Sequence, residues 1–127
     1  MKQFLTYTTI VESITGIMLV VVPARIVSIL FGIELSDQAG IIVAMIAGAA
    51  IFSMSLICWL LRDRDWASIA VQGLLVYNTS LTAILLYGNF SFGLQGWVLW
   101  SIIIFHGVQS LACLYFLRKK VMVSTAS

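Results

Sequence analysis

The chain has 127 residues, of which 61% are hydrophobic and 9% charged, and its formal charge at pH 7 is +2. A soluble domain carries about 25% charged residues, so this composition excludes an ordinary soluble enzyme or binding module and predicts an integral membrane protein. The small net charge gives no argument for a nucleic-acid partner.

The first predicted element is a membrane-spanning helix over about residues 4–22, which ends at Pro23 because proline removes a helix hydrogen bond. Residues 23–32 begin with that proline and end with Gly32, an arrangement typical of a short helix. This segment is too short to cross a bilayer, so we expect it to lie at the membrane interface. Three further spans are predicted at about residues 39–61, 66–87 and 94–117.

These elements predict an all-α fold, an integral membrane four-helix bundle. A crossing needs roughly 20 helical residues, and the alternation of polar and apolar residues that marks a membrane β-barrel is absent. Short connections favour an up-down-up-down bundle in a single domain of residues 1–127, with the interfacial helix between spans one and two.

The basic residues predict the orientation. Arg25 is the only basic residue on the side of the membrane that the first span leads to, whereas the other basic residues all lie on the opposite side of the predicted bundle. They are Lys2, Arg62, Arg64, Arg118, Lys119 and Lys120. The positive-inside rule then places both termini in the cytoplasm, and the chain is expected in a bacterial inner membrane.

Glu12, Asn78 and His106 lie near the middles of three different spans. A charged residue at mid-helix costs roughly 2.5–3.5 kcal/mol on insertion scales. Glu12 is therefore expected to face the protein interior, where His106 is a partner at matching depth and Asn78 reaches in from the third span. Both an ion pair and two neutral groups that share a proton are compatible with the sequence.

Three more polar residues extend this candidate site. Thr9 shares the helical face of Glu12, Gln109 shares that of His106, and Gln72 belongs to a broader polar arc on the third span. The set predicts binding of a small hydrophobic or amphipathic molecule, or of a proton, at the centre of the bundle.

The alternative is that the polar residues only fix helix register, in an accessory or homo-oligomeric subunit of a membrane complex. A cavity beside Glu12 and His106 would favour binding, whereas a filled interior would favour the accessory role. An enzyme is less expected, no cofactor is indicated, and one histidine with one carboxylate is too small a set for a structural zinc site.

Small residues recur at every fourth position in the second span, at Gly40, Ala44 and Gly48. Such spacing lets helix backbones approach closely in lipid. It is compatible with internal packing and with a homodimer interface.

The layout resembles that of small four-span bacterial inner-membrane proteins, including the DoxX-like group. The resemblance depends on the number of spans, the break at Pro23, the segment Leu30-Phe31-Gly32 and the helix end 58–62, Cys-Trp-Leu-Leu-Arg. It implies a four-helix membrane bundle and transfers no functional residue to this chain.

Overall fold

The computed structural model describes residues 1–124, with side chains as far as Lys119. Within these residues the chain forms five helices: α1 (Lys2–Val21), α2 (Pro23–Phe31), α3 (Gln38–Leu61), α4 (Ala67–Phe92) and α5 (Leu99–Ser124). All except α2 are long and apolar enough to cross a membrane. The predicted all-α four-helix bundle is therefore confirmed.

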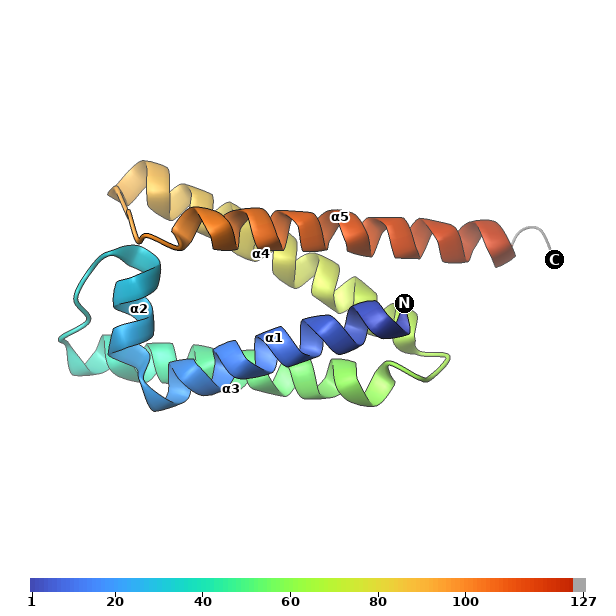
Figure 1. Ribbon diagram of the computed structural model, residues 1–127, viewed down its shortest axis with the longest axis horizontal. Helices are drawn as coiled ribbons and strands as arrows, with labels where there is room; N and C mark the ends of the chain where they lie inside the picture. Colours follow the sequence, from blue (N-terminus) through green and yellow to red (C-terminus); the bar gives the residue numbers. More distant parts are fainter. Residues whose placement is uncertain (125–127) are drawn as a thin grey trace.

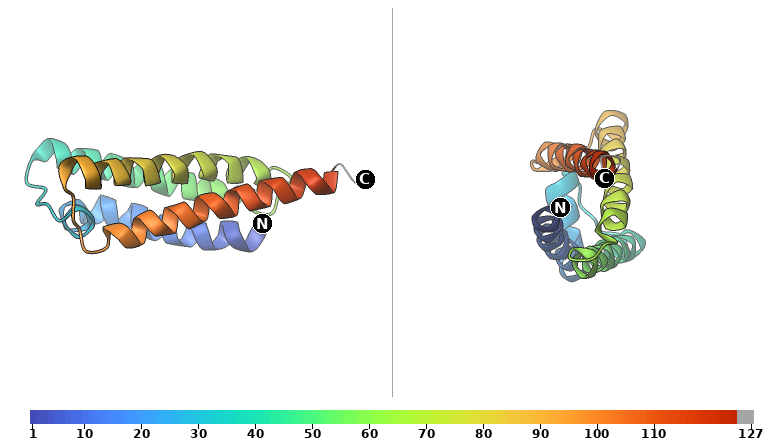
Figure 2. Two further views of the ribbon diagram at one scale, coloured as in Figure 1. Left: turned by 90° about the horizontal axis from the view of Figure 1, so that it is seen from above. Right: turned by 90° about the vertical axis from the view of Figure 1, so that its right-hand side faces the viewer.

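The long helices are arranged as two pairs (Figure 1). α1 packs along α3, and α4 packs along α5. α3 and α4 meet at the turn that joins them and then diverge toward the other end of the bundle. Seen end-on, α1 and α3 are viewed nearly along their axes, whereas α4 and α5 are inclined to them (Figure 2).

The short helix α2 lies across the end of the bundle that is opposite the N-terminus (Figure 1). Pro23 stands at its first position, and Gly32 ends it in the left-handed conformation with φ 71°. Glycine adopts this conformation without the steric cost that a Cβ would bring. The predicted short helix over residues 23–32 is thus present, and it connects the two helix pairs at this end.

α4 is longer than the predicted span, which ended at residue 87. The helix continues through Gly88 to Phe92, and Gly93 ends it with φ 65° and a backbone bond to Asn89. Gly88, which was expected to begin a turn, lies within the helix. It is buried against the Leu94 side chain, which leaves no room for a Cβ at this position.

α5 begins at Leu99 rather than at residue 94. Residues 93–96 have no regular secondary structure and residues 97–98 form a turn, and this segment contacts the end of α2. The Gln95 amide donates to the Phe31 carbonyl at 3.2 Å. Gly96 lies directly against the Leu30 carbonyl, where no side chain fits.

Close approach of two backbones holds α1 against α3. Gly16 and Gly48 are buried opposite each other, and a methyl group added to Gly48 would lie 2.6 Å from the Gly16 carbonyl oxygen. Ala44 is buried one turn earlier in α3. The structure therefore places Ala44 and Gly48 in an internal interface, whereas the nearest neighbours of Gly40 are the local side chains of Leu35 and Asp37.

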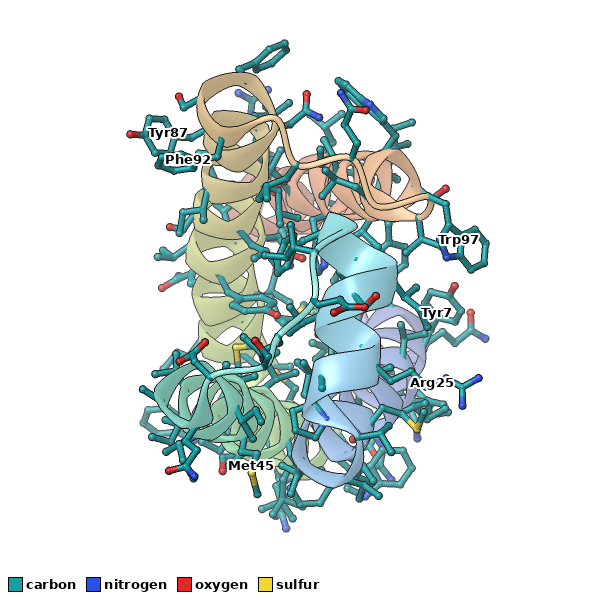
Figure 3. The ribbon with its side chains drawn as sticks, turned by 90° about the vertical axis from the view of Figure 1, so that its left-hand side faces the viewer. Tyr7, Arg25, Met45, Tyr87, Phe92 and Trp97 are labelled. Atoms are coloured by element: carbon teal, nitrogen blue, oxygen red, sulfur yellow. The ribbon has the colours of Figure 1, made fainter. Side chains whose placement is uncertain are left out.

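The predicted basic side of the bundle lies at the end opposite α2. There the Lys2 ammonium forms an ion pair of 2.8 Å with Asp63 in the α3–α4 turn. Arg25 is at the other end, on α2, and points away from the bundle (Figure 3). The side chain of Lys120 lies outside the described residues.

Candidate functional site

Asn78 and His106 form a hydrogen-bonded pair between α4 and α5. Asn78 is fully buried, and its Nδ2 donates to the Leu74 carbonyl at 2.7 Å, one turn earlier in the same helix. This bond leaves Oδ1 facing His106 Nδ1 at 2.6 Å. Because Oδ1 only accepts, Nδ1 must carry the proton, and the other ring nitrogen, Nε2, is left for another partner.

Glu12 reaches this pair from α1 and is only 2% exposed. Its Oε1 lies 3.9 Å from His106 Nδ1, which is too long for a direct hydrogen bond. Its Oε2 accepts from the Tyr77 hydroxyl at 3.4 Å. Among the described residues, Oε1 has no hydrogen-bond partner. The three residues expected together are thus brought together, with Asn78 rather than Glu12 bonded to the imidazole.

Tyr77 is a member of the site that the sequence analysis missed. Its hydroxyl contacts Glu12, and its ring stands edge-on to the His106 ring with centroids 5.8 Å apart. Phe105 makes a similar contact at 5.3 Å. The signal was present in the sequence, because Tyr77 lies at mid-span. There its hydroxyl needs a polar partner within the protein, whereas the hydroxyl of an interfacial tyrosine can bond to water.

The other predicted site residues are divided. Gln109 is buried and accepts from the Thr8 hydroxyl at 3.1 Å, which links α5 to α1, but its Nε2 has no partner among the described residues. Thr9 is buried on α1 and lines a separate hollow of about 300 Å³ beside α3. Gln72 is exposed on α4 and lies outside the group around Glu12.

A pocket of about 600 Å³ adjoins the buried polar group. Its polar lining comes from Glu12, Tyr77, His106 and Thr15, and the Thr15 hydroxyl is already bonded to the Val11 carbonyl. The remaining lining side chains are apolar, and they come from all five helices and from the α2–α3 connection. The pocket is therefore an apolar chamber with one polar wall.

The pocket is bounded by an apolar cluster at one end and by α2 at the other, and some of its lining residues are exposed. Beyond the polar group, toward the N-terminus, an apolar cluster that includes Leu5, Val71 and Leu74 fills the bundle. At the other end α2 lies across the bundle and contributes apolar side chains to the lining (Figure 3). Val43 on α3 and Ile33 line the pocket and are nevertheless 65% and 47% exposed. The opening is therefore on the side of α3, where α3 and α4 diverge.

No set of three or more histidine, cysteine, aspartate or glutamate side chains converges within the part of the chain that the structure describes. Cys58 and Cys113 are buried as free thiols in the apolar cluster near the N-terminus. What the site offers chemically is a carboxyl, an imidazole and a phenol, facing an apolar space.

No protein-family model, curated protein or solved structure matches this chain. The likeness in layout to the DoxX-like group stays a prediction from the sequence.

Proposed function

We propose that this chain is a multi-pass inner-membrane protein that binds a small hydrophobic or amphipathic molecule in the pocket beside Glu12, Tyr77 and His106. Both termini lie in the cytoplasm. The grouping of basic residues at the end opposite α2 supports this orientation, since cytoplasmic loops carry the excess of lysine and arginine.

The observation that carries the proposal is an unpartnered Glu12 oxygen in the polar wall of an apolar pocket. The volume, about 600 Å³, lies within the range of roughly 300–1,000 Å³ that is typical of small-molecule sites. A buried polar group without a partner costs about 1–3 kcal/mol. A bound molecule with a polar head removes this cost, and the apolar walls receive its body.

Two observations favour binding over an accessory role in which the polar residues only hold the helices. The interior beside Glu12 and His106 is not filled. Ala44 and Gly48 are also buried against α1, so they do not form the outward-facing surface that a homo-oligomer would use. Proton uptake by the Glu12–His106 pair is compatible with ligand binding and is part of the same site.

The experiment compares two substitutions on one helix. Ala47 and Ala50 are both exposed on α3, but Ala47 lines the pocket at its rim and Ala50 lies outside it. Ala47→Phe should fill the pocket, while Ala50→Phe adds the same ring to the lipid-facing surface. Native mass spectrometry of the full chain, extracted in a mild detergent, should show a small molecule retained by the parent protein and by Ala50→Phe.

Ala47→Phe should lose the retained molecule while the protein stays monodisperse on size exclusion. Equal retention by both variants, or no small molecule retained by any of the three proteins, would count against the proposed function.

A further inference from the structure

We infer that the pocket selects a molecule whose polar head is a neutral hydroxyl, held between the Glu12 carboxyl and His106 Nε2, on an apolar body taken from the surrounding lipid. This inference rests on the proposed function and adds the chemical class of the ligand. It follows from which polar atoms at the pocket are engaged and which are free.

The first step concerns the imidazole. Asn78 Oδ1 contacts His106 Nδ1 at 2.6 Å and can only accept, since Asn78 Nδ2 donates to the Leu74 carbonyl. Nδ1 therefore holds a proton whatever the charge of the ring. Nε2 accepts a hydrogen bond when the ring is neutral and donates one when the ring is charged. Asn78 therefore acts as a positioning residue: by holding the proton on Nδ1, it makes Nε2 the nitrogen that gains or loses a proton.

The second step concerns the carboxyl. Oε1 of Glu12 has no partner among the described residues, and Oε2 has only the long contact of 3.4 Å with Tyr77. A proton that moves between the Glu12 carboxyl and His106 Nε2 changes which group donates and which accepts. The two groups are close, since Glu12 Oε1 lies 3.9 Å from Nδ1 of the same imidazole. The net charge of the pair stays zero in both arrangements.

A hydroxyl fits both arrangements because it donates one hydrogen bond and accepts others. It donates to Nε2 and accepts from the protonated carboxyl in the neutral pair, and it reverses both roles in the ion pair. An anionic head is disfavoured, since no lysine or arginine among the described residues lines the pocket and Glu12 would repel it. An ether or ester lacks the donor and leaves one protein acceptor unpaired.

The third step concerns the source of the ligand. The exposed rim at Val43 and Ile33 is apolar, and Val43 lies on a helix that is apolar enough to cross a membrane. The opening beside α3 therefore faces acyl chains within the hydrophobic layer. An amphiphile dissolved in the bilayer reaches the pocket sideways, with its body against the apolar walls.

The test uses four probes with one hydrocarbon chain and different heads: hexadecanol, its methyl ether, hexadecylamine and hexadecanoic acid. Each is titrated into the full-length protein in nanodiscs of neutral lipid, and binding is followed by native mass spectrometry. We expect hexadecanol to bind at least about tenfold more tightly than the methyl ether, the factor that corresponds to roughly 1.4 kcal/mol. The amine and the acid should also bind more weakly than the alcohol.

Two variants assign the preference to the proposed atoms. Glu12→Leu and His106→Phe should each lower the ratio of alcohol to ether affinity, because each removes one of the two groups that the hydroxyl contacts. Thr15→Val is the matched control, because Thr15 lines the same pocket but its hydroxyl is bonded to the Val11 carbonyl. It should keep the tenfold ratio. Circular dichroism and size exclusion establish that each variant is folded, and Glu12→Met replaces Glu12→Leu if the latter is not, since methionine also has no strong hydrogen-bonding group.

The outcomes separate this inference from the proposed function. Equal binding of alcohol and ether, or tighter binding of the amine or the acid, overturns the hydroxyl head; if Ala47→Phe abolishes that binding, the pocket itself stands. If Ala47→Phe leaves the binding of every probe unchanged, or the parent protein binds no probe, both the inference and its basis fail.

Discussion

The same substitution, glycine to alanine, should have opposite effects at two positions in the membrane helices. At Gly48 a methyl group would lie 2.6 Å from the Gly16 carbonyl oxygen and 2.7 Å from the Leu19 Cβ, about 0.8 Å closer than the 3.4 Å at which ordinary contact begins. A methyl group added at Gly73 on α4 would meet no described atom within 4 Å, apart from the backbone of its own helix. The first position is closed by backbone, which cannot move aside, and the second is open to lipid.

The magnitudes follow from two competing terms. Overpacking costs typically 1–3 kcal/mol, while alanine is favoured over glycine in a helix by about 1 kcal/mol. Gly48→Ala should therefore lose up to roughly 2 kcal/mol net, because α1 and α3 must separate. Gly73→Ala has only the favourable term and should gain up to about 1 kcal/mol.

Thermal unfolding of the purified protein in a mild detergent, followed by tryptophan fluorescence, measures both shifts in one assay. The midpoint should fall for Gly48→Ala and rise for Gly73→Ala. If the two shifts have the same sign, α1 and α3 are not in the close contact described above. Gly107→Ala, at a second open position, serves as a repeat of the control.

Three other predictions test the site and its surroundings. Asn78→Ala should leave the buried Nδ1–H of His106 without an acceptor and lower stability by about 1–3 kcal/mol, measured in the same unfolding assay. On intact cells, Ser91→Cys should react with a membrane-impermeant thiol reagent and Asp63→Cys should not. The two native cysteines are buried and give no background. The reverse pattern would refute the orientation. The Lys2 ammonium, hydrogen-bonded to Asp63, holds the pKa of that carboxyl below its ordinary value of 3.8, so the pair stabilises the protein above that pH and the contribution is lost in stronger acid. Lys2→Gln should accordingly lower the unfolding midpoint slightly at neutral pH and leave it unchanged in strong acid. The decrease at neutral pH should be seen only at low salt, since both side chains are exposed.

The number, order and type of the helices could be predicted from the sequence because each depends on local information. Apolar runs of span length predict the four long helices. Pro23 and Gly32 predict α2, and both residues mark its ends in the structure. The start of α5 could not be predicted in this way. It depends on the contact of Gly96 with the Leu30 carbonyl, which joins residues that are far apart in the sequence.

The sequence identified most residues of the candidate site but not the contacts between them. Burial of Glu12, Asn78 and His106 follows from the cost of exposing polar groups to lipid, so depth along each span identified them. Depth says nothing about which face of a helix a residue occupies. Gln72 was included because it belongs to a broad polar arc on the third span, and the structure places it on an exposed face of α4. Tyr77 was omitted although it is the residue that bonds to Glu12.

The structural and the ligand-binding interpretations of the polar residues apply to different atoms. In lipid, apolar surfaces provide little force to join helices, so hydrogen bonds and close packing decide which helices meet. The bonds from Asn78 to His106 and from Thr8 to Gln109 serve this purpose, because they join α4 to α5 and α5 to α1. A purely structural role would leave the Glu12 carboxyl equally well paired. Its Oε1 instead has no partner among the described residues, and Glu12 lines an apolar pocket of about 600 Å³. The bonds that join the helices therefore do not account for the unpaired Glu12 oxygen.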